Sequence, residues 1–85
     1  MAYRIAFKPS ARQELLRLPH VIGLRIEQRI DALAVAPRPP GVVKLQGEEN
    51  AWRIRVGDYR IVYEIHDREI VIVVLRIAHR KDVYR

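Results

Sequence analysis

The spacing of apolar residues near the start of the chain predicts a short strand followed by a helix. Residues 3–7 alternate between polar and apolar side chains, which is typical of a strand. Residues 8–10 (Lys-Pro-Ser) then open a helix, because proline is tolerated in the first helical turn. Ala11, Leu15 and Leu18 recur at spacings of four and three and give this helix one apolar face.

A second helix is predicted from about residue 20 to residue 36. Its apolar positions fall on one stripe, formed by Ile22, Ile26, Ile30, Leu33 and Ala34. Only the turn at Pro19 separates the two helices, so we expect an antiparallel helical hairpin. The segment 37–41 (Pro-Arg-Pro-Pro-Gly) ends the second helix and redirects the chain.

The rest of the chain has the pattern of a sheet. Strands and turns alternate in the order 52–56 (strand), 57–58 (turn), 59–66 (strand), 67–68 (turn) and 70–77 (strand). The last strand is apolar throughout except at Arg76, which is typical of a central strand covered on both faces. The pattern therefore predicts an α+β fold of order β-α-α-β-β-β, with the helical hairpin packed on one face of a small, mainly antiparallel sheet.

Length and composition favour one compact cytoplasmic domain spanning residues 1–85. A chain of 85 residues, 49% of them hydrophobic, can hold one core. It contains no cysteine, which excludes disulfides and thiolate metal sites. The N-terminus lacks a signal-peptide core, and the longest apolar run, residues 70–75, is far shorter than the ~20 residues that span a bilayer.

The charge balance indicates a polyanionic partner. The chain has 16 Lys and Arg against 10 Asp and Glu, a formal charge of +6. Either a nucleic acid or an acidic protein fits this charge. Arginine greatly outnumbers lysine, and the planar guanidinium suits phosphate recognition better than a lysine does.

Strand alternation predicts an arginine-rich sheet face turned away from the helices. Its expected members are Arg53, Arg55, Arg60, Arg76 and Arg80. The same face is expected to carry Val62, Ile72 and Val74, which are unusual in a solvated surface. They indicate a seat for a partner's apolar segment, or a sheet edge covered by a loop. An ordinary solvated sheet face with alternating arginines is the alternative reading.

Three stretches resemble the RelE branch of the RelE/ParE toxin superfamily. They are residues 44–47 (KLQG), 52–63 (WRIRVGDYRIVY) and 77–84 (IAHRKDVY), and the element order matches over essentially the whole chain. The resemblance implies a RelE-like fold and a type II toxin that cuts mRNA in the ribosomal A site, inhibiting translation without metal or cofactor. It also implies a cognate acidic, RelB-like antitoxin that forms a hetero-oligomer with the toxin.

The resemblance also carries over residue roles. Positions that act in the family correspond here to Arg53, Arg55, Arg60, Arg80 and Tyr84. Arg60 is expected to hold the pentavalent phosphate, Arg80 to act on the leaving group, and Tyr84 to orient or stack the nucleotide. Arg55 completes the catalytic set. The expected RNA-binding residues are Arg53, Arg55, Arg76, Lys44 and Lys81, and the expected antitoxin-binding residues are Val62, Ile72 and Val74.

The general base is open. Well-known members of the family carry lysines where this chain has Arg53 and Arg55, and an arginine side chain stays protonated. Tyr84, His79, His66 or the ribosome itself are the candidates. Structural roles compete for the histidines: His79 shares the parity of the core face and His66 ends a strand. Likewise His20 simply starts a helix, and Glu48 and Glu49 read as solvated loop charges.

Two other functions fit the same fold. A ParE-like toxin would inhibit DNA gyrase, although gyrase poisons generally lack the full set of Arg60, Arg80 and Tyr84. A degenerate toxin would act only as an antitoxin-binding subunit, which the arginines at positions 53 and 55 leave open.

Overall fold

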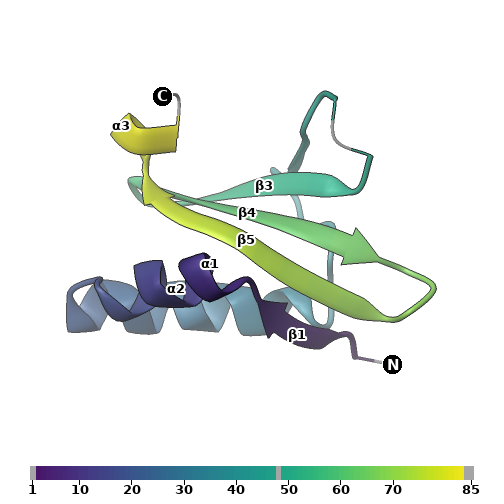
Figure 1. Ribbon diagram of the computed structural model, residues 1–85, viewed down its shortest axis with the longest axis horizontal. Helices are drawn as coiled ribbons and strands as arrows, with labels where there is room; N and C mark the ends of the chain where they lie inside the picture. The colour runs from purple at the N-terminus through teal and green to yellow at the C-terminus, as the bar shows by residue number, and fades with distance from the viewer. Residues whose placement is uncertain (1, 48, 84–85) are drawn as a thin grey trace.

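A computed structural model describes residues 2–47 and 49–83 of the chain. Its elements, in chain order, are β1 (Arg4–Phe7), α1 (Pro9–Leu16), α2 (His20–Leu33), β2 (Val43–Lys44), β3 (Ala51–Val56), β4 (Tyr59–His66), β5 (Val71–His79) and α3 (Arg80–Val83). The five strands form one sheet of order β1-β5-β4-β3-β2. Helices α1 and α2 lie on one side of this sheet, and α3 lies on the other side at the end of β5 (Figure 1).

The predicted α+β fold is confirmed, and the sheet is mixed. β1 runs parallel to β5, while β5, β4, β3 and β2 pair antiparallel. Two elements were not predicted, the two-residue β2 and the four-residue α3. Both are shorter than the stretch over which a repeat of apolar positions becomes visible.

The helices begin where the sequence predicts and end slightly earlier. α1 has its proline in the first turn, and α2 begins at His20. The helical hydrogen bonds of α2 stop at Leu33, but the Ala36 amide still donates to the Ala32 carbonyl at 3.0 Å. The chain therefore leaves the helix through one further turn before Pro37.

The core lies between the helical hairpin and one sheet face. Its members are Ala11, Leu15, Ile26, Ile30, Leu33, Ile54, Val56, Ile61, Tyr63, Ile65, Ile72, Val74 and Ile77. In β3 and β4, the apolar positions that alternate with the predicted outer residues are all members of this core or packed against it. Their side chains leave the opposite face of these two strands to the alternate, mainly charged positions.

A bulge in β5 reverses the predicted orientation of half that strand. Val62 pairs with Arg76, but the next residue of β4, Tyr63, pairs with Val74, so Leu75 is an extra residue in β5. The extra residue shifts the two-residue side-chain period by one position. In the part of β5 that precedes the bulge, the side chains that face the core are therefore those that simple alternation places on the outer face.

The prediction that Ile72 and Val74 bind an antitoxin is consequently wrong. Both side chains are fully buried in the core beneath the helices. The outer face is occupied here by Val73, which pairs with Glu64. Ile70, predicted to begin the strand, lies in the preceding turn with a positive φ of 56°.

The loop between α2 and β2 is tied to the sheet by polar contacts. Arg38 forms a bidentate ion pair with Asp67, at 2.9 and 3.4 Å, and Asp67 also accepts a 2.6 Å hydrogen bond from the Tyr3 hydroxyl. These donors, Arg38 first, hold the pKa of Asp67 below its ordinary value. The Tyr63 hydroxyl donates to the Pro37 carbonyl at 2.7 Å, and burial raises the pKa of that hydroxyl to about 12. The loop is thus held near its middle, at Pro37 and Arg38.

Candidate functional site

The outer face of the sheet brings three of the predicted arginines together. Arg55 of β3 pairs directly with Arg60 of β4, and Arg53 pairs with Val62. These positions alternate with the core residues Ile54 and Ile61, so they lie on the face away from α1 and α2. Two arginines side by side on neighbouring strands repel each other unless an anion lies between them.

Arg60 is buried and lacks partners for two of its donor atoms. The residue is only 6% exposed, and its Nε and Nη1 atoms have no hydrogen-bond partner within the described residues. Burying a charged donor without a partner is costly, so such groups in folded proteins are commonly those that bind a ligand. An anion with several acceptor oxygens, such as a phosphate, would satisfy both atoms.

Arg60 opens onto a basic cavity of about 300 Å³. Its lining consists of Arg29, Pro40, Gly41, Val43, Arg53, Ile54, Arg55 and Arg60. None of these described residues carries a carboxylate. β2 pairs only with Trp52 and Arg53, so the cavity lies where the edge of β3 becomes free. We refer to it below as the arginine cavity.

Arg29 and the segment at Pro40 and Gly41 were missed by sequence reasoning. Arg29 lies on an exposed face of α2, where a charged residue is the ordinary expectation. The periodicity of a sequence does not show which helix residues lie next to which edge of the sheet. Only the folded structure shows that Arg29 lines the same cavity as Arg53 and Arg55.

Arg80 is not among the residues that line the arginine cavity. It is the first residue of α3 rather than a continuation of the sheet face, and its amide donates to the Asp58 carbonyl at 2.7 Å. Its Nε lies 3.8 Å from the Asp58 carboxylate, and its side chain is 58% exposed. Lys81 is likewise exposed on α3, and Tyr84 lies outside the described residues.

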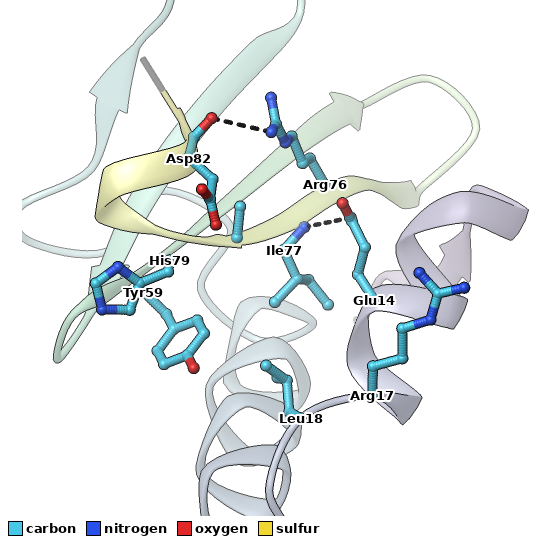
Figure 2. A pocket seen from close by; sticks show the side chains of 9 residues that line it. Glu14, Arg17, Leu18, Tyr59, Arg76, Ile77, His79 and Asp82 are labelled. Carbon is cyan, nitrogen blue, oxygen red and sulfur yellow. Dashed lines mark hydrogen bonds between the residues drawn. The ribbon is translucent and has the colours of Figure 1, made fainter. Parts of the chain in front are cut away.

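Arg76 is engaged by the C-terminal helix. Its Nη2 donates to the Asp82 carbonyl at 3.0 Å, at one wall of another cavity of about 460 Å³ (Figure 2). Next to Arg76 in sequence, the Ile77 amide donates a 2.9 Å hydrogen bond to Glu14 of α1, which also lines this cavity (Figure 2). Because this cavity carries both carboxylates and arginines, its charge does not favour an anion. Arg76 therefore helps to hold α3 in place.

Lys44 lies on the wrong face to join the arginines. It pairs with Trp52, which packs against the core, and its Nζ sits 5.9 Å from the centre of the Trp52 ring. The neighbouring Val43 pairs with Arg53 and lines the arginine cavity. Lys44 is exposed and does not line the arginine cavity, and its assignment as an RNA-binding residue stays a prediction.

The three histidines lie outside the arginine cavity, at positions where they contact neighbouring side chains or begin a helix. His79 packs edge-on against Tyr59, with 5.3 Å between ring centres, in agreement with its predicted core-side position. His66 lies 3.0 Å from Glu64, and His20 is the first residue of α2, as predicted. None of the three lines the arginine cavity. Glu49 is an exposed loop residue, and Glu48 is outside the described residues.

The described residues contain neither a metal-binding cluster nor a membrane-spanning helix. Across residues 2–47 and 49–83, no group of three or more His, Asp or Glu side chains is arranged to hold a metal ion. In the same part of the chain, no helix is long and apolar enough to cross a bilayer.

Comparison with known proteins identifies the family. Residues 5–84 match the family model described as ParE toxin of type II toxin-antitoxin system, parDE. Toxin RelG of Mycobacterium tuberculosis is 31% identical, over 100% of this chain and 99% of the relative. Toxin RelE of the same organism is 32% identical, over 98% and 87% of the two chains.

Solved structures of relatives have the same fold. The archaeal RelE–RelB complex of Pyrococcus horikoshii OT3 superposes with a TM-score of 0.84, at 30% identity, over 98% of this chain and 100% of the other. A toxin–antitoxin complex of M. tuberculosis, RelBE2, gives a TM-score of 0.82 at 29% identity, over 94% and 100%. The basic sheet face, the fold and the sequence relatives agree, and the chain belongs to the RelE/ParE family of toxins from type II toxin–antitoxin systems.

Proposed function

We propose that this toxin is a ribosome-dependent endoribonuclease that cuts mRNA in the ribosomal A site. The observation that carries the proposal is the buried Arg60 guanidinium, which has two unsatisfied donors and belongs to a residue that lines a cavity together with Arg53 and Arg55. A phosphodiester in this cavity would complete those hydrogen bonds and neutralise the adjacent charges. The binding free energy would then be largest when negative charge on phosphorus is largest, which is in the transition state.

The proposed reaction is a transesterification within the RNA. The 2′-oxygen attacks the adjacent phosphorus as its proton leaves, and the bond from phosphorus to the 5′-oxygen breaks. The departing 5′-oxygen takes up a proton from solvent, so the products are a 2′,3′-cyclic phosphate and a 5′-hydroxyl. Arg60 donates to the non-bridging oxygens, Arg55 and Arg53 position the backbone, and Arg80 stabilises the departing 5′-oxygen.

The described residues of the cavity supply electrostatic stabilisation and no general base. Arginine remains protonated, and no histidine or carboxylate lines the cavity. We therefore assign the removal of the 2′-proton to Tyr84 or to a group of the ribosome. Lys81, exposed on α3, would contact RNA next to Arg80.

We also propose that an acidic, RelB-like antitoxin neutralises the toxin in the cytoplasm. The relatives from P. horikoshii and M. tuberculosis were crystallised with their antitoxins. Val62 pairs with Arg53 on the outer face, and Val73 lies on the same face. An amphipathic antitoxin segment would place apolar side chains on these valines and carboxylates over the arginines.

The test is cleavage of mRNA on programmed ribosomes, with the 5′ ends of the products mapped. The chain should cut within the A-site codon, and Arg60→Ala and Arg80→Ala should each lower the rate by at least about 100-fold, the usual cost of losing one transition-state donor. Arg68→Ala, in the exposed turn after β4, is the matched control and should cut normally. Equal rates for all four proteins would contradict the assigned roles.

Gyrase inhibition is the second candidate, because the matching family model describes ParE toxins. A chain that binds antitoxin, produces no cuts and blocks supercoiling by DNA gyrase would establish this function instead. If it did neither, only the antitoxin-binding role would remain.

A further inference from the structure

We propose that the RNA strand leaves the reacting phosphate over the free edge of β3 and that Arg29 of α2 binds a flanking phosphate there. This inference rests on the proposed function, which assigns the reacting phosphate to Arg60. It adds a contact from the helical layer, on the far side of the sheet from the outer face. The observation that carries it is that Arg29 and Arg60 line one cavity.

The sheet edge provides an open path between the two layers. β2 covers β3 only as far as Trp52 and Arg53, so the later residues of β3 have no neighbouring strand on that side. At this opening the cavity wall is formed by Pro40, Gly41 and Val43. A strand that leaves Arg60 along β3 would therefore meet α2 without crossing the core.

Arg29 lines this opening from the helical layer, in the same cavity as Pro40 and Gly41. The loop that carries Pro40 and Gly41 is anchored just before them. The Tyr63 hydroxyl donates to the Pro37 carbonyl, and Arg38 pairs with Asp67. These contacts restrict the loop before any ligand arrives, which lowers the entropy cost of binding.

The positive charge that lines the cavity exceeds the single negative charge of one phosphodiester. Arg29, Arg55 and Arg60 bring three positive charges, and no described lining residue is acidic. A single-stranded RNA backbone presents one negative charge at each nucleotide, so consecutive phosphates match a row of arginines running from the sheet face to the helix. Arg29 and Arg55 are exposed and sit where such a backbone would enter or leave.

The experiment measures binding of a single-stranded oligoribonucleotide with 2′-O-methyl groups, which cannot be cleaved. Fluorescence anisotropy at several salt concentrations gives both the affinity and its dependence on salt. Arg29→Ala should weaken binding about three- to tenfold and lower the slope of log K against log salt by about 0.7, the value for one phosphate contact on a single strand. Arg29→Lys should retain the slope, because it keeps the charge.

Arg25→Ala is the matched control, since Arg25 is another exposed arginine of α2 and does not line the cavity. Its affinity for RNA should lie within about twofold of that of the original chain. If Arg25→Ala lost as much affinity as Arg29→Ala, the effect would come from the overall charge of the protein, and the inference would be overturned. Unchanged RNA binding by Arg29→Ala, or a loss confined to antitoxin binding, would also overturn it.

Cleavage on ribosomes is measured separately from binding. If the chain cuts mRNA but Arg29→Ala does not weaken RNA binding, the proposed RNA path is refuted and the proposed nuclease activity is not. If the chain does not cut mRNA but Arg29→Ala does weaken RNA binding, the proposed nuclease activity is refuted and the RNA contact at Arg29 is retained.

Discussion

Arg60 combines burial with unsatisfied hydrogen-bond donors, which no stability argument explains. Its partners on the neighbouring strands are Arg55 and Ala78, and its Nε and Nη1 atoms find no acceptor among the described residues. A buried, unpaired charge lowers the stability of the fold. Its presence at the centre of the proposed site is consistent with a group held ready for a phosphate, at a cost to the unliganded protein.

Replacing Arg60 by methionine should therefore stabilise the toxin while abolishing cleavage. Arg60→Met keeps much of the side-chain volume and removes the unsatisfied donors, so the free energy of unfolding should rise by roughly 1–3 kcal/mol. Urea unfolding measures this change. Arg55→Met, at an exposed position on the neighbouring strand, should change stability by less than about 0.5 kcal/mol. Destabilisation by Arg60→Met would show that Arg60 is satisfied by contacts that support the fold.

Tyr63 gives a prediction with a defined pH range. Because burial raises the pKa of its hydroxyl to about 12, the folded protein keeps this proton at pH values where the unfolded chain, with a pKa near 10, has lost it. The resulting stability is complete below about pH 10 and is lost as the pH rises towards 12. In Tyr63→Phe this alkaline loss should be absent.

The same variant tests the hydrogen bond to the loop. Tyr63→Phe removes the donor to the Pro37 carbonyl and should lower the free energy of unfolding at pH 7 by about 1 kcal/mol. Chemical unfolding at pH 7, 9 and 11 provides both comparisons. A stability difference between the two proteins that stayed constant up to pH 11 would contradict the assigned pKa.

At the scale of elements, the bulge in β5 decides which residues form the core and which form the surface. Before the bulge, Val74 faces inward opposite Tyr63; after it, Arg76 faces outward opposite Val62. Without the extra residue at Leu75, the same strand would bury its other set of side chains. The bulge thus joins two strand segments of opposite parity into one strand.

Alanine substitutions separate the two faces. Ile72→Ala should lower the free energy of unfolding by roughly 2–5 kcal/mol, because it leaves a cavity beneath the helices. Val62→Ala, on the outer face, should cost less than about 1 kcal/mol and instead weaken antitoxin binding. Thermal unfolding and calorimetric titration with the antitoxin measure the two effects. Equal destabilisation by both changes would contradict the assignment of faces.

At the scale of the whole molecule, the formal charge of +6 governs encounters with anionic partners. We expect the acidic antitoxin to bind with nanomolar affinity or tighter, and its association rate to fall at least about tenfold between low and high salt. The dissociation rate should change much less, since it depends on the buried contacts around Val62. Stopped-flow mixing at several ionic strengths distinguishes the two rates. Micromolar binding, or a salt effect confined to dissociation, would contradict this arrangement.

The sequence by itself determined the order of the elements, the helical hairpin and the facing of β3 and β4. These features follow from local periodicity, because a side chain's direction relative to its own strand or helix depends on residues a few positions away. For the same reason, Arg53, Arg55 and Arg60 were correctly placed on one outer face. The family resemblance added the roles of these residues, which pattern does not contain.

Only the tertiary structure decided the strand register, the burial of Arg60 and the set of residues that line the arginine cavity. The bulge at Leu75 arises from pairing with a distant strand, so alternation placed Ile72 and Val74 on the wrong face. The burial of Arg60 and the arrival of Arg29 at the same cavity likewise depend on where β2 stops and how the loop after α2 is anchored. Register, strand edges and burial are set by contacts between residues far apart in the chain, and periodicity carries no information about them.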